Sequence, residues 1–293
     1  MRRGQNRGAA LLMVLWLLVL LIALLSVFAL SARTEGLQAH YLARSAAARY
    51  AAEAGLELAV LRLQSDDDAR RWVGDGRPYR FSFEDEAIEV RIVDETGKVD
   101  LNAATADLLI GLMRALGTDE LRAQAIAGAI IDFRDSDDLL NAVGGAEDRE
   151  YSAAGLPYGA KDAGIATIEE LQQVLGMDAE LYRRMRPYLT VHSGQVRPDP
   201  TYAQAPVLEA MGLTPDEVNR IVTAREQPLG QGLPARPDGG ELAPRGTGTY
   251  SISSRATRRD GTQARITMTL RLGGNGASGS LYTPLALLEG DSD

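Results

Sequence analysis

The stretch AALLMVLWLLVLLIALLSVFALSA, residues 9–32, contains no charged side chain. As a helix rising about 1.5 Å per residue it reaches about 36 Å, more than the roughly 30 Å hydrocarbon core of a bilayer. The preceding residues, MRRGQNRG, carry Arg2, Arg3 and Arg7. Because basic flanks stay cytoplasmic, the sequence predicts one membrane-spanning helix with the rest of the chain on the other side.

Three kinds of N-terminal segment fit this pattern. A cleaved secretory signal has a shorter apolar region of about 7–15 residues, although Ala29–Ala32 offers small residues for such a cut. A plain membrane anchor requires only the apolar run. The third is a leader cut between Gly8 and Ala9, since a short basic segment ending in Gly resembles the substrates of prepilin peptidase. The residues that follow favour this third interpretation.

The helical pattern continues beyond the apolar run. Residues 33–64 keep apolar and small side chains at helical spacing, with charged residues between them. One long helix, apolar in its first half and amphipathic in its second, is typical of pilin-like proteins. Most of these have Glu at the fifth mature position, where this chain has Met13, and no acid occurs before Glu35. In pilin-like filaments that carboxylate pairs with the N-terminal ammonium of the neighbouring subunit. A subunit without it suits an end position in a filament, where this pairing is not required.

The composition excludes several classes of protein. The chain has 40 Asp and Glu against 31 Lys and Arg, a formal net charge of −9, which argues against binding nucleic acid by phosphate neutralisation. There is no Cys, so disulfides, thiol catalysis and thiolate metal sites are excluded. His40 and His192 stand apart, and no nucleophile occurs with a matching base. We therefore predict a protein that is not an enzyme.

Strand patterns occur on both sides of a helical block. Alternating residues predict strands at 79–83 and 87–94, and again at 249–257, 263–272 and 281–288. This order predicts one sheet interrupted by an inserted helical domain. Within the insertion, capping residues and terminating Gly residues predict two helices that begin after Thr105 and at Thr167. Four further helices are predicted at 119–133, 179–186, 206–212 and 214–224. An extended segment is predicted at 188–191 and a Gly/Pro-rich linker at 228–240.

An acidic loop follows the second predicted helix. Residues 132–148 contain six acidic side chains against one base, Arg134. Close carboxylates repel one another unless a cation is shared between them, and Ca²⁺ accepts six to eight oxygen ligands in flexible geometry. The loop is not an EF-hand, because it lacks the Gly at position 6 and the Glu at position 12. A bend at Gly144-Gly145 would bring its two ends together; the alternative is a solvated acidic loop. The candidate ligands are Asp135, Asp137, Asp138, Glu147 and Asp148.

Several stretches resemble the type II secretion minor pseudopilin K family. They are GKVDLNAAT (97–105), AIIDFRDSDD (129–138), GAEDREY (145–151), PYGAKDAGIATIEELQQVLGM (157–177) and YRRMRPYLTV (182–191). The missing Glu at the fifth mature position also fits this family. The resemblance implies a pilin-like α+β fold with a large inserted all-α domain. It further implies calcium binding and a place at the tip of a periplasmic pseudopilus, with minor pseudopilins I and J and other pseudopilins as partners.

The predicted organisation combines these observations. We expect the body to lie in the periplasm, anchored in the bacterial inner membrane, and prepilin peptidase to free Ala9 as the new, methylated N-terminus, where pilins commonly have Phe or Met. The predicted segments are a leader at 1–8, a transmembrane helix at 9–32, a first pilin-like part at 33–99, a first helical unit at 100–195, a second helical unit with linker at 196–240, and last strands with a tail at 241–293.

A membrane-tethered DNA receptor is the alternative function. VDLNAATADLLIGLMRALG (99–117) resembles the first helix of helix-hairpin-helix modules, which hold phosphate with backbone N–H groups. The next residues, Gly117-Thr118-Asp119-Glu120, are acidic where such a hairpin requires Gly and a base. Repulsion from phosphate favours shared helical packing over nucleic-acid binding.

Overall fold

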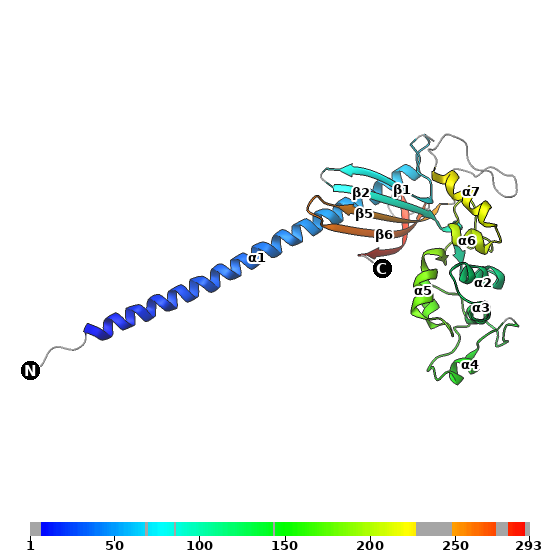
Figure 1. The fold of residues 1–293 in the computed structure, drawn as a ribbon, viewed down its shortest axis with the longest axis horizontal. Coiled ribbons are helices and arrows are strands. Elements are labelled where there is room, and N and C mark those ends of the chain that lie inside the picture. The colour runs from blue at the N-terminus through cyan, green and yellow to red at the C-terminus, as the bar shows by residue number, and fades with distance from the viewer. Residues whose placement is uncertain are drawn as a thin grey trace, which may run out of the picture.

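A computed structural model describes residues 7–67, 70–84, 86–142, 144–226, 248–273 and 281–290. Helix α1 (Arg7–Leu63) projects as a long rod from the body of the molecule (Figure 1). Every large apolar side chain from Leu11 to Leu30 is more than half exposed. Within the described ranges, α1 is the only helix long and apolar enough to cross a membrane, as the sequence predicts. Residues 1–6 of the expected leader lie outside the described part of the chain.

The C-terminal half of α1 packs on a five-stranded antiparallel sheet. The strands are β1 (Asp75–Phe83), β2 (Glu86–Asp94), β5 (Thr249–Thr257), β6 (Gln263–Leu272) and β7 (Tyr282–Glu289), in the order β1-β2-β5-β6-β7. Alternate apolar residues of the strands face the helix, and small residues of α1 let it approach closely. At Gly55 an added Cβ would lie 2.3 Å from Ser254 Oγ. This core contains Ala51, Ala52, Leu56, Ala59, Val60, Ile88, Val90, Ile92, Tyr250, Ile252, Ile266 and Leu270.

Strands β2 and β5 are direct neighbours although the helical insertion separates them in the sequence. Ile92 pairs with Ile252 in the antiparallel register, and Ile252 pairs in turn with Met268 of β6. The predicted sheet with strands from both ends of the chain is therefore confirmed. The linker predicted at 228–240 and most of the segment between β6 and β7 lie outside the described residues.

The insertion forms a second hydrophobic core beyond the end of the sheet (Figure 1). Large side chains from several helices fill it, including Leu109, Met113, Ile130, Phe133 and Tyr151. Its elements are the 3₁₀ turn η1 (Glu95–Gly97), β3 (Val99–Asp100), α2 (Ala106–Ala115), α3 (Glu120–Arg134), α4 (Asp148–Ala153), η2 (Ile168–Gln173), α5 (Ala179–Met185), η3 (Arg186–Tyr188), β4 (Leu189–Thr190), α6 (Ala205–Ala210) and α7 (Pro215–Glu226).

One local expectation needs correction. The segment from Thr167 is the 3₁₀ turn η2 and not an α-helix, because the Thr167 side chain makes no capping hydrogen bond. The carboxylate of Glu170, the other half of the predicted capping box, accepts Lys161 at 2.5 Å on one oxygen and the N–H of Ala166, not that of Thr167, at 3.3 Å on the other. The sequence patterns also miss the short helix α4 and the parallel pairing of β3 with β4, which depends on residues about 90 positions apart.

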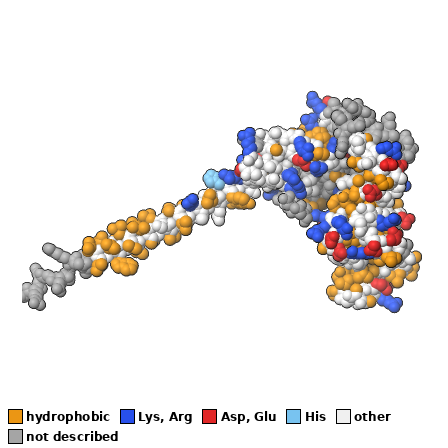
Figure 2. Space-filling view, viewed as in Figure 1, with side chains coloured by type: hydrophobic (Ala, Val, Ile, Leu, Met, Phe, Trp, Pro, Cys, Tyr) orange, Lys and Arg blue, Asp and Glu red, His pale blue; other side chains and the backbone are white. Residues whose placement is uncertain are grey.

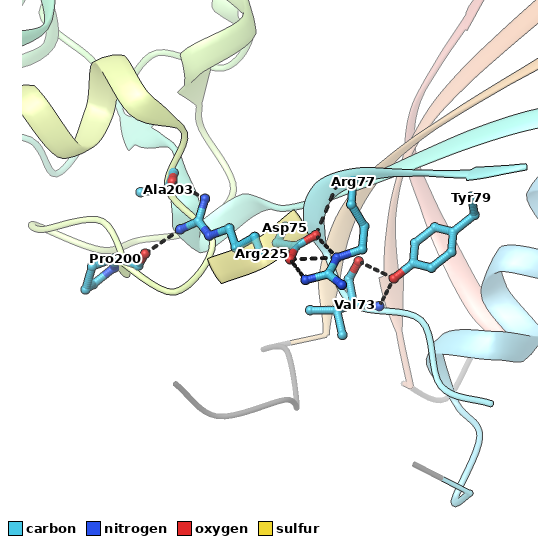
Figure 3. A network of polar contacts seen from close by, with 7 residues as sticks. All are labelled: Val73, Asp75, Arg77, Tyr79, Pro200, Ala203 and Arg225. Carbon is cyan, nitrogen blue, oxygen red and sulfur yellow. Dashed lines mark hydrogen bonds and ion pairs between the residues drawn. The ribbon is translucent and has the colours of Figure 1, made fainter. Parts of the chain in front are cut away.

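Two groups of polar contacts lie close together where the insertion meets the sheet (Figure 3). The buried guanidinium of Arg225, on α7, donates to the carbonyls of Pro200 at 2.6 Å and Ala203 at 2.7 Å. Beside it at the start of β1, Arg77 pairs with the buried carboxylate of Asp75 at 2.7 Å. Buried charges persist only with such partners, so these contacts stabilise each side of the junction, and the charge of Asp75 also acts on Arg225 across it.

Candidate functional site

The acidic loop lies in the helical insertion, between the C-terminal end of α3 and the start of α4 (Figure 1). Asp135 is the C-cap of α3, and its N–H donates to the carbonyl of Ile131 at 3.1 Å. Arg134, the single base of the loop, donates to the carbonyls of Leu101 and, at 2.7 Å, Ala104. Its hydrogen bonds therefore go to backbone carbonyls and not to the loop carboxylates.

Asp132 clamps the two ends of the loop. Its side chain is fully buried, and Oδ2 accepts the N–H of Asn141 at 3.1 Å and of Ala146 at 2.9 Å. The loop lies directly on α3, because an added Cβ at Gly128 would be 1.4 Å from the carbonyl oxygen of Gly144. Gly144 has a φ of +112°, so the expected bend at this position is present.

Three buried carboxylate oxygens in this region accept no hydrogen bond from the described residues. They are Asp132 Oδ1, Asp135 Oδ1 and Glu147 Oε1. Burial, followed by the charges of Asp132 and Asp135, raises the pKa of Glu147 to about 7. Burial also raises the pKa of Asp132, partly offset by its two backbone donors. These buried carboxylate oxygens carry negative charge and have no donor or cation beside them among the described residues. A positive ion bound among them would therefore lower their electrostatic energy.

The predicted ligands occupy different parts of the loop. Asp135 and Glu147 are at its buried side, and both Asp138 and Asp148 are exposed at its rim. Asp137 Oδ1 accepts the N–H of Leu139 at 2.9 Å, which uses that side chain in a local turn. In the described part of the chain, no three carboxylate or histidine side chains already converge in the geometry of a bound metal.

Asp162 belongs to the same cluster and was not predicted from the sequence. Burial, and then the charges of Asp148, Asp138 and Asp135, raise its pKa. Its φ of +53° turns the chain, and Lys161 anchors that turn through Glu170. The sequence signal for it is the GAKDAG stretch (159–164). Asp162 is 14 residues after Asp148 in the chain, so their proximity in the fold cannot be read from the sequence.

The donors fit a hard cation such as Ca²⁺. All of them are carboxylate oxygens, those of Asp135 and Glu147 include a buried oxygen without a hydrogen-bond donor among the described residues, and the loop contains no His. Asp135, Asp138, Glu147, Asp148 and Asp162 would hold the ion. Bound there, it would supply charge neutralisation and cross-link the loop, α4 and the turn at Asp162.

The processing residues lie at the other end of the molecule. The backbone at Gly8 and Ala9 is already helical as part of α1. The fold brings them near neither the sheet nor the acidic loop, as Figure 1 shows from the length of α1. The expected cut between them stays a prediction.

These features together define a pilin-like subunit: an apolar helix whose second half packs on an antiparallel sheet, with a helical domain inserted between two neighbouring strands. The type II secretion system protein K family model matches residues 90–194. A type II secretion system protein K from Klebsiella pneumoniae is 32% identical over 252 residues, 75% of this chain and 76% of that protein. Another from Pectobacterium carotovorum subsp. carotovorum is 31% identical over 64% of this chain and 63% of its own length.

A solved structure has the same fold. A chain in the crystal structure of the GspK-GspI-GspJ complex from enterotoxigenic Escherichia coli aligns with a TM-score of 0.57 at 20% identity, over 89% of this chain and 99% of that chain. The chain described here belongs to the type II secretion system protein K family. It is a minor pseudopilin, which confirms the resemblance and the predicted fold class. These matches give no support to the DNA receptor alternative.

Proposed function

We propose that the protein caps a periplasmic pseudopilus and supports export of folded proteins across the outer membrane. The observation that carries this role is the position of the insertion, at the end of the sheet away from the apolar half of α1 (Figure 1). A helical domain of this bulk at every step of a thin filament would obstruct the next subunit. The absence of an acid before Glu35 supports an end position too.

The proposed partners are minor pseudopilins I and J, together with other pseudopilins. The support is the fold shared with a chain of the complex that contains such proteins, and the exposed apolar half of α1. Exposed apolar side chains over this length require lipid or other helices around them. Residues 9–32 would serve first as an inner-membrane anchor and then as the packing surface in the filament, with the body in the periplasm.

The proposed role is structural and involves neither catalysis nor nucleic acid. His40 lies on α1 and His192 lies beyond β4, on a different part of the fold. The turn between α2 and α3 presents Asp119, whose Oδ1 caps α3 by accepting the Arg122 N–H at 2.9 Å. A carboxylate at this hairpin repels phosphate.

Processing by prepilin peptidase tests the proposal most directly. Intact-mass analysis of the membrane form, with and without the peptidase, should show loss of residues 1–8 and methylation of Ala9. Cleavage near Ala32 would contradict the proposal. Replacing residues 9–32 by an unrelated apolar helix should preserve membrane retention and abolish secretion; full secretion would show that the segment is only an anchor.

Calcium binding at the acidic loop is the second part of the proposal. The ion would stabilise the insertion by about 2.7 kcal/mol at a hundredfold excess over Kd. Chelator should therefore lower the melting temperature of the full chain, and Asp138→Ala with Glu147→Ala should abolish that difference. The matched control is Asp107→Ala with Glu180→Ala, two exposed acids outside the loop. No response to chelator or calcium in metal-free protein would favour the solvated loop.

A further inference from the structure

The five side chains that would hold calcium come from two separate parts of the insertion. One part is the acidic loop with the start of α4, and the other is the turn at Asp162. Burial raises the pKa of Asp162, and so do the charges of Asp148, Asp138 and Asp135, which places these acids close together. Most of the Asp and Glu side chains visible in Figure 2 lie over the insertion, which carries both parts. A shared ion requires the two parts to be held at a fixed separation.

The turn after β3, residues 101–104, is tied to the first of these parts. Arg134, which directly precedes Asp135 at the end of α3, donates to the carbonyls of Leu101 and Ala104. Both carbonyls belong to this turn, which leads into α2. The start of the acidic loop is therefore fixed against the turn.

The same turn is tied to the second part through Asn102. Its Oδ1 accepts the N–H of Ile165 at 2.7 Å, and its Nδ2 donates to the carbonyl of Ile165 at 2.8 Å. An amide that uses its acceptor and its donor on one residue fixes both the position and the orientation of that backbone. Ile165 is buried and lies three residues after Asp162. Lys161 stiffens the residues between them by donating to the carbonyl of Gly164 at 2.9 Å.

The turn is itself held in place by the buried carboxylate of Asp100, at the end of β3. Its Oδ1 accepts the backbone N–H of Asn102 at 2.9 Å. Its Oδ2 accepts the N–H of Gly194 at 2.7 Å and the hydroxyl of Ser193 at 3.1 Å. Hydrogen bonds to a buried carboxylate are strong, so Asn102 presents its amide from a fixed backbone.

We propose that Asn102 is a positioning residue of the calcium site, which holds the turn of Asp162 in place for the ion. The proposal rests on the calcium part of the proposed function. Asn102 acts through Ile165 and Asp162 and is not itself a ligand. Removing a side chain that supports a metal ligand from outside typically weakens metal binding about 10- to 100-fold, because the ligand is then no longer held in position.

Isothermal titration of the metal-free full chain in detergent with calcium chloride tests the proposal. Asn102→Ala should raise the Kd about tenfold. Asn102 is exposed, so the substitution leaves no cavity in the core. The matched control, Asn219→Ala, changes an exposed Asn of α7 and should leave the Kd unchanged. A residue with only a structural role would lower the free energy of unfolding in chelator without changing the Kd, and this result would overturn the proposal.

Combining the substitution with Asp162→Asn shows whether Asn102 acts through that ligand. Asp162→Asn alone should also weaken calcium binding. Adding Asn102→Ala should then cause no further change, since the ligand that Asn102 positions is already lost. A second weakening of about tenfold in the double variant would show that the two residues act independently, which contradicts the proposal.

Two results separate the possible failures. If wild type takes up no calcium, the calcium part of the proposed function is wrong and the role of Asn102 falls with it, whereas the filament role is unaffected. If wild type binds calcium and Asn102→Ala has the Kd of wild type, only the role of Asn102 is refuted.

Discussion

Glu147→Gln should have opposite effects on stability with and without calcium. In the calcium-free protein the folded state holds the proton of Glu147 up to a pKa of about 7, compared with an ordinary value of 4.5. Folded protein therefore binds more protons than unfolded protein between these values, and the free energy of unfolding falls as pH rises through that window. The loss is complete above a pH of about 7 and absent below a pH of 4.5.

The magnitude follows from the size of the shift. A difference of about 2.5 pH units corresponds to about 3 kcal/mol, which is an upper figure because neighbouring carboxylates titrate together. The amide introduced by Glu147→Gln is neutral at every pH. In chelator at a pH of about 8, the free energy of unfolding of the variant should therefore exceed that of wild type by up to about 3 kcal/mol. At a pH of about 4.5 the two free energies of unfolding should be equal. With calcium at the higher pH, the variant should instead be the less stable protein, because it lacks a charged ligand.

Urea unfolding of the full chain, followed by circular dichroism at pH values of about 4.5, 6 and 8, measures these differences. Glu209→Gln, an exposed acid on α6, is the control and should show no dependence on pH or calcium. Destabilisation of the calcium-free protein by Glu147→Gln at the highest pH would show that burial among like charges is not the dominant effect. Equal stabilisation of the variant and the wild type by calcium would show that Glu147 is not a charged ligand of the ion.

Three further substitutions test the packing that positions the site. Gly128→Ala places a Cβ 1.4 Å from the Gly144 carbonyl and should cost about 1–3 kcal/mol in urea unfolding, while Ala127→Gly, its neighbour, should leave the loop in place. Gly55→Leu forces α1 away from Ser254 and should make the sheet more sensitive to proteolysis; unchanged cleavage would contradict the close approach. Arg225→Gln removes charged donors from two buried carbonyls and should lower the free energy of unfolding by about 2–3 kcal/mol, without altering calcium binding.

Elements with a strong local signal were predicted correctly. The strands expected at 249–257 and 263–272 have those bounds in the structure, because alternation between a packed and an exposed face is written directly in the sequence. The side chain of Thr105 caps α2, as expected from its position before an apolar run. The α-helix predicted from Thr167 was wrong. Glu170 binds Lys161 and the N–H of Ala166 and not the N–H of Thr167, and the local sequence pattern does not reveal these contacts.

The candidate site was predicted only in part. The acidic composition of residues 132–148 identified the region, and Gly144 marked the bend. The sequence could not show that Asp162 approaches from a separate turn. It also could not show that Asp132 is a clamp for two backbone N–H groups, since both relations depend on how the loop folds over α3.

The apolar helix, the alternation of each strand and the order of strands around a helical block can be predicted from the sequence, because each depends on neighbours within one turn or one strand. Which carboxylates share a buried region and which arginines lie opposite each other depend on packing and strand register. Glu147 is buried among acids from three segments, and Arg255 faces Arg265 through strand register. Electrostatic energy depends on distance in space, and for residues far apart in the chain that distance is set by packing.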